Sequence, residues 1–129
     1  MQVLIIILNE IEYLESVVKL LRETGIRGAT VLDGLGSNSK NSQLSTPSFL
    51  ASIVESLEQG GHVKKIIISL VERDEQVQSA MDKINELVNN ENKKTSGAIM
   101  MTLPVNHMRG GELERHIIRR DSKKDNQGS

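Results

Sequence analysis

The residues best suited to hold a charged ligand lie in a glycine- and serine-rich stretch near the middle of the chain. The segment GLGSNSKNSQLS, residues 34–45, carries Gly34 and Gly36 and then a run of mostly hydroxyl and amide side chains. Glycines let backbone N–H groups approach a phosphate closely, and hydroxyl groups add hydrogen-bond donors. The same composition is typical of a flexible linker, or of a loop that inserts into a partner protein. The local sequence leaves these three interpretations open.

Residue spacing gives no catalytic or metal-binding constellation. The three histidines, His62, His107 and His116, do not share a metal-ligand spacing on any one expected element. The chain has no cysteine, which excludes disulfide bonds, thiolate chemistry and cysteine-ligated zinc. No serine, histidine and aspartate combine at a spacing that suggests nucleophilic catalysis. We therefore expect that the protein is not an enzyme and holds no resident metal or cofactor.

Composition narrows the range of partners. At 129 residues the chain is long enough for one domain with a proper core, and its formal net charge is −1. Such a balance gives no general attraction to nucleic acid or to an anionic membrane. With no tryptophan, one tyrosine and one phenylalanine, the chain also lacks a platform on which bases could stack. We expect no binding to nucleic acid.

The apolar N-terminal run VLIIIL, residues 3–8, has the pattern of a strand buried on both faces. The run is too short to span a bilayer, and it lacks the positively charged flank of a signal peptide. We therefore expect a cytoplasmic protein without membrane insertion.

Hydrophobic periodicity divides the chain into four strands and three helices. The strands are expected over residues 3–8, 28–33, 63–71 and 98–105. Asn9 and Asp74 are expected to cap the two longer helices, and Gly25 to end the first of them. A threonine and a proline at positions 46 and 47 predict a short third helix from about residue 48 to residue 58.

This order of elements predicts a ferredoxin-like fold of the α+β class, a β-α-β-β-α-β sandwich with an extra short helix in its central loop. We expect the domain to fill residues 1–112, with residues 37–62 as a loop insertion and residues 113–129 as a polar tail without stable structure. The helices of such a sandwich cover only one face of the sheet. Because three of the strands are apolar at nearly every position, we expect other copies of the chain to bury the bare face.

The segment TGIRGATVLDGLG, residues 24–36, resembles the second-strand region of the PII signalling proteins. Those proteins have a glycine-rich turn, a Gly-x-Thr-Val strand and a Gly-Phe-Gly turn in this place. The later segments VKKIIISLV and TLPV, residues 63–71 and 102–105, also match in order and spacing. The likeness is greater to divergent PII-like proteins than to the nitrogen regulators themselves. The resemblance implies a homotrimer that regulates a partner, a transporter or an enzyme, through its central loop.

The resemblance also implies a nucleotide effector (ATP, ADP, AMP or a cyclic nucleotide) bound in clefts between subunits. The ligand-binding residues that it implies are Thr30, Gly34, Leu35 and Gly36 at the loop base, Lys93, Lys94, Thr95, Ser96 and Gly97 in the turn before the last strand, and Arg109 of the neighbouring subunit. The loop residues implied to contact the partner are Ser37, Asn38, Ser39 and Lys40. Taken by itself, the turn ENKKTSG is more typical of a solvated connection. A trimeric scaffold without a nucleotide site is therefore the alternative.

Departures from the nitrogen regulators limit what the resemblance implies. The loop has no counterpart of the tyrosine that is modified in many of them, and no lysine follows the glycine of KTSG. We therefore do not expect uridylylation, or the usual sensing of ATP together with 2-oxoglutarate. An acylphosphatase-like hydrolase is also disfavoured, because the segment NEIEYLE after the first strand lacks an arginine.

Overall fold

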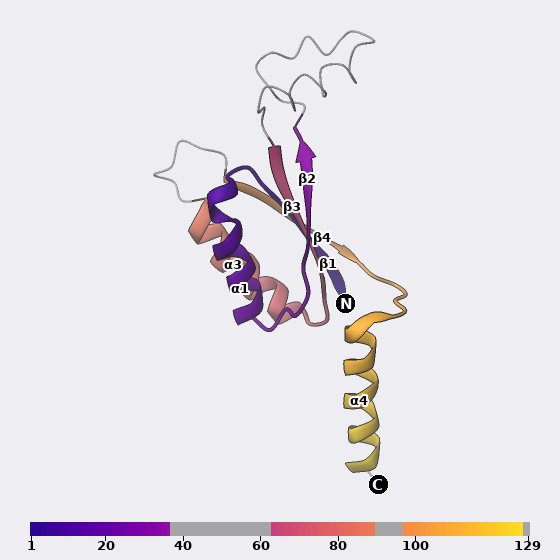
Figure 1. Ribbon diagram of the computed structural model, residues 1–129. Coiled ribbons are helices and arrows are strands. Elements are labelled where there is room, and N and C mark those ends of the chain that lie inside the picture. Colours follow the sequence, from indigo (N-terminus) through magenta and orange to yellow (C-terminus); the bar gives the residue numbers. More distant parts are fainter. Residues whose placement is uncertain (37–62, 90–96, 128–129) are drawn as a thin grey trace, which may run out of the picture.

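A four-stranded antiparallel sheet with two helices on one face forms the body of the protein (Figure 1). The computed structural model describes residues 1–36, 63–89 and 97–127. Its elements are β1 (Gln2–Leu8), η1 (Ile11–Tyr13), α1 (Leu14–Glu23), β2 (Thr30–Leu35), β3 (Val63–Val71), α3 (Asp74–Val88), β4 (Ala98–Pro104) and α4 (Gly111–Gln127). The strand order is β2-β3-β1-β4. The ferredoxin-like fold expected from the sequence is therefore confirmed, whereas the expected helix over residues 48–58 lies outside the described residues.

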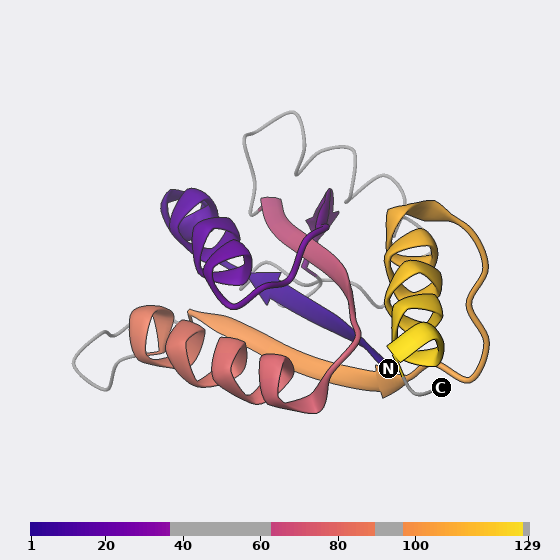
Figure 2. The ribbon, with the colours of Figure 1, turned by 90° about the horizontal axis from the view of Figure 1, so that it is seen from below.

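The core lies between the sheet and the pair α1 and α3, which Figure 2 shows on the same side of the strands. β1 supplies alternate residues to it, since Leu4, Ile6 and Leu8 are fully buried. The rest of the core comes from four groups of residues: Val17 and Leu21 of α1; Ile26, which lies between α1 and β2; Ile67 and Val71 of β3; and Val77, Ala80, Ile84 and Val88 of α3. The helix residues follow the spacing of three and four that places them on one face of each helix.

The starts of both long helices differ from the predictions. Asn9 does not cap α1, because the 3-10 turn η1 comes first and α1 begins only at Leu14. Asp74 is the first residue of α3 rather than its cap, and the Gln76 side chain accepts the backbone N–H of Arg73 at 3.2 Å instead. Gly25 follows α1 with a φ of 84°, as predicted for a glycine at a helix end.

One polar side chain is enclosed in the core. Ser69 of β3 is 1% exposed, and its hydroxyl oxygen has no hydrogen-bond partner among the described residues. A buried hydroxyl without a partner loses its hydrogen bonds to water, and no hydrogen bond within the protein compensates for that desolvation cost. Ser69→Ala is therefore expected to raise the free energy of unfolding by about 1 kcal/mol in urea denaturation. Val71→Ala, on the same face of the same strand, should lower it by about 2 kcal/mol through cavity formation. A loss of stability in Ser69→Ala would contradict this interpretation.

The second face of the sheet is apolar, and neither α1 nor α3 covers it. Strand register places on this face Val3, Ile5 and Ile7 of β1, Ile66, Ile68 and Leu70 of β3, Ile99, Met101 and Leu103 of β4, and Leu32 of β2. We call this surface the open face. Ile99 and Leu103 remain 58% and 52% exposed. The near-continuous apolar strands thus have one face in the core and one face that the described part of the chain leaves open.

The C-terminal segment is a helix where a tail without structure was expected. α4 extends from below the sheet on the side of the open face, opposite α1 and α3 (Figure 2). Leu113 and Ile117, one turn apart, are half-buried, and Arg120 forms an ion pair with Glu72 at the end of β3. The prediction missed α4 because its anchor, Glu72, is distant in sequence. No helix in the described ranges combines the length and apolar character needed to cross a bilayer.

Candidate functional site

Most of the described candidate residues meet at one end of the sheet. β1 and β2 end there, and β3 and β4 begin there, because all neighbouring strands are antiparallel. Leu8 pairs with both Lys65 and Ala98, and Leu35 pairs with Val63. We call this the loop end of the sheet; in Figure 1 it is the end at which β2 terminates. Gly34, Leu35, Gly36 and Gly97 all lie here.

Gly34 in β2 and Gly36 just after it allow side chains of β3 to lie against the backbone. Neither Gly34 nor Gly36 has a positive φ, so neither is required for an unusual turn. A methyl group on Gly34 would lie 2.7 Å from Cδ1 of Ile66, and one on Gly36 would lie 2.8 Å from Nζ of Lys64. A larger residue at either position would therefore displace the end of the Ile66 or Lys64 side chain. The consequence at Gly36 is that a lysine ammonium group sits directly beside the backbone at the loop base.

Lys64 is a candidate ligand-binding cation that sequence reasoning missed. Strand alternation sends Lys64 to the open face and Lys65 to the helix-covered face. Lys65 is neutralised by an ion pair with Asp33 of β2. Among the residues that the structure describes, Lys64 has no carboxylate partner, so its charge is available to an anion. A signal was present in the pair KK before the apolar run of β3, but the face of each lysine depends on strand register.

Gly97 has a packing role at the start of β4. A methyl group at this position would overlap the carbonyl oxygen of Val88 and lie 2.5 Å from its carbonyl carbon. The Asn89 side chain accepts the Ala98 N–H at 2.8 Å and donates to the Ala98 carbonyl at 3.0 Å. The carbonyl of Gly97 in turn accepts the Asn9 N–H at 3.0 Å. These contacts fix where the chain leaves α3 and enters β4, a positioning role for Asn89 that the sequence did not suggest.

Two candidates lie away from the loop end. Thr30, the first residue of β2, pairs with Ile68 in the middle of the open face. Arg109 follows β4, whose last residue Pro104 pairs with Gln2, so it belongs to the opposite end of the sheet. Its side chain is 94% exposed and lies 3.6 Å from Glu114. A site that used both Arg109 and the loop end would therefore need residues from two copies of the chain.

The remaining predicted residues fall outside the part of the chain that the structure describes. They are Lys93, Lys94, Thr95 and Ser96 of the turn before β4 and the loop residues 37–40. Within the described ranges no group of histidine and acidic side chains is arranged to hold a metal ion. Among the described residues, the geometry at the loop end is that of a cation and close-lying backbone, which can bind an anion.

Comparison with known proteins identifies relatives of this fold. The sequence model of the nitrogen regulatory protein P-II family matches residues 1–110. A putative PII-like signalling protein from Thermus thermophilus has a similar crystal structure, with a TM-score of 0.51 and 12% sequence identity. That similarity covers 81% of this chain and 85% of the other. Among curated protein sequences, none matches the chain.

Proposed function

The chain belongs to the nitrogen regulatory protein P-II family, and on that premise we propose that it is a homotrimeric regulatory protein rather than an enzyme. In this proposal it binds a small anionic ligand, an adenine nucleotide, in clefts between its subunits. It then regulates a partner protein, a transporter or an enzyme, through residues 37–62. We place it in the cytoplasm.

The observation that carries the proposal is the open face. Apart from Lys64 and Thr30, its side chains are aliphatic or methionine, and they have no cover from α1 or α3. Soluble monomers rarely expose a contiguous apolar patch of this kind. Proteins of the P-II family generally form trimers, and three sheets that face one another would bury this surface. The occupant of the open face is therefore a further copy of the chain.

The loop end supports the ligand part of the proposal. Lys64 lies beside the backbone of Gly36 and, among the described residues, has no acidic partner. A phosphate group would accept hydrogen bonds from this ammonium group and from nearby backbone N–H groups. Arg109 is too far from this end within one chain, so we assign it to the cleft formed with a neighbouring copy. Lys93, Lys94, Thr95 and Ser96 complete the proposed ligand contacts.

A trimeric scaffold without a nucleotide site is the second candidate, and one observation favours it. Gly97 has a packing reason to be glycine, since a methyl group there would overlap the backbone carbonyl of Val88. Its presence is therefore explained without any ligand. The two candidates differ in whether the purified protein binds a nucleotide.

A ligand panel tests the nucleotide site. We expect ATP, ADP, AMP or a cyclic nucleotide to raise the melting temperature, because a ligand that binds only the folded state stabilises it. Lys64→Ala and Arg109→Ala should each weaken the binding roughly tenfold in calorimetry, because each removes a charged partner of the phosphate. Lys83→Ala, an exposed lysine on α3, is the matched control and should bind normally. Absence of both heat and thermal shift at millimolar nucleotide would favour the scaffold.

A further inference from the structure

α4 is a feature of this chain beyond the family match. The P-II sequence model ends at residue 110, and α4 begins at Gly111. The helix lies on the same side of the sheet as the open face (Figure 2). Any assembly that buries the open face against other copies must therefore bring α4 close to those copies.

α4 has little support within its own chain. Gly110 and Gly111 precede it with φ values of 93° and 77°, and a side chain at either would meet nothing within 4 Å. Its inward side consists of half-buried residues, and its ion pair to the body is Arg120 with Glu72. Helices of this length are marginal in water unless an apolar stripe is packed. A further packing partner would stabilise α4.

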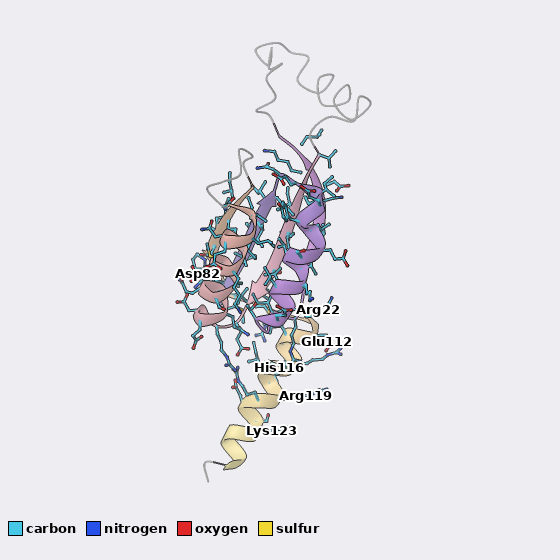
Figure 3. The ribbon with its side chains drawn as sticks, turned by 90° about the vertical axis from the view of Figure 1, so that its left-hand side faces the viewer. Arg22, Asp82, Glu112, His116, Arg119 and Lys123 are labelled. Atoms are coloured by element: carbon cyan, nitrogen blue, oxygen red, sulfur yellow. The ribbon has the colours of Figure 1, made fainter. Side chains whose placement is uncertain are left out.

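The outward side of α4 combines an exposed apolar residue with charges of both signs. Two of these charges pair within the helix, Arg115 with Glu112 at 3.8 Å and Asp121 with Arg120 at 3.5 Å. Ile118 is 56% exposed and lies about 100° further round the helix than the half-buried Ile117. Residues three or four apart are neighbours on a helix. Asp121 therefore borders Ile118 on one side, and Arg115 borders it on the other, with side-chain exposures of 59% and 72%. Arg119, also exposed, extends the basic side, and Figure 3 shows it between His116 and Lys123 along α4.

We propose that the α4 helices of neighbouring copies pack against one another around Ile118, below the sheets. Asp121 of each helix then faces Arg119 of the next. This inference rests on the proposed trimer. A ring of three is a head-to-tail contact, in which one flank of each helix meets the other flank of its neighbour. α4 meets that requirement around Ile118, with Asp121 on one side and Arg119, which has no ion pair among the described residues, on the other, so that opposite charges adjoin at every contact. The occupant of the outward face of α4 is thus α4 of another copy.

Cross-linking of the full chain tests this arrangement. The chain has no cysteine, so Ile118→Cys introduces a single thiol. Treatment with a short bis-maleimide should yield covalent dimers that reach a plateau at about two thirds of the chains, because a ring of three leaves one thiol without a partner. Asp82→Cys is the matched control. Asp82 is exposed on α3, in the helix layer away from the open face (Figure 3), and should give no cross-link.

The mass of the untreated variant, measured by light scattering, separates the possible failures. A trimeric mass without cross-linking would overturn the α4 contact and leave the proposed assembly standing. Conversion of nearly all chains to dimers would indicate a twofold pairing of α4 and would also overturn the ring. A monomeric mass of wild-type protein would overturn the proposed trimer and, with it, this inference.

Discussion

Ile5→Asp is expected to convert the proposed trimer into folded monomers of 14.3 kDa. Ile5 is central on the open face, in one row with Ile68 of β3 and Met101 of β4. In an assembly, the new carboxylate would be enclosed among aliphatic side chains without a partner, at a cost of several kcal/mol for each copy. In a single chain it stays partly in water, since Ile5 is only half-buried. Assembly should therefore fail while the core on the other face remains intact.

Light scattering and circular dichroism together measure this effect. The matched control is Ile11→Asp, which makes the same substitution at a residue of η1 that is 52% exposed and lies outside the sheet. The control should keep the wild-type mass. If Ile5→Asp also keeps the wild-type mass, the open face is not the contact between copies. If it loses its helical and strand signal, the substitution has disrupted the fold, and Met101→Asp on the edge strand β4 becomes the variant to measure.

Gly97→Ala is expected to lower the free energy of unfolding by about 3 kcal/mol or more. The added methyl group would overlap the carbonyl of Val88, which is backbone at the end of α3 and cannot swing aside like a flexible side chain. Either α3 must shift away from β4, or the two hydrogen bonds from the Asn89 side chain to the backbone N–H and carbonyl of Ala98 must break. Each adjustment gives up packing or hydrogen bonds that the wild-type chain makes.

Thermal unfolding should show a decrease of roughly 10 °C or more in the melting temperature of Gly97→Ala. Gly28→Ala is the matched control, because a methyl group there meets nothing within 4 Å and the backbone has no positive φ. The control should be neutral or slightly stabilised, since alanine restricts the unfolded chain. Equal melting temperatures for the two variants would mean that the close approach of Gly97 to Val88 is not a structural requirement.

The sequence determined the elements whose signal is local. The runs that predicted β1, β3 and β4 to within one residue were VLIIIL, VKKIIISLV and AIMMTLPV, because strands buried on two faces are apolar at successive positions. The apolar faces of α1 and α3 were predicted from the spacing of three and four residues along the chain. The glycine that ends α1 was predicted because glycine readily adopts a positive φ. The order of these elements then determined the fold, and two-faced apolar strands predicted the open face.

The tertiary structure decided which residues can act together, because strand register and helix docking depend on contacts between distant positions. Strand register placed Lys64 and Lys65 on opposite faces of the sheet. Lys65 therefore pairs with Asp33, and Lys64 lies beside Gly36. Register also placed Arg109 and the loop end at opposite ends of the sheet, so that one chain cannot complete a site from both. The contact of Arg120 with Glu72 anchored a helix where local composition suggested only a tail. None of these pairings has a local signal, because each joins residues that the chain brings together only after it has folded.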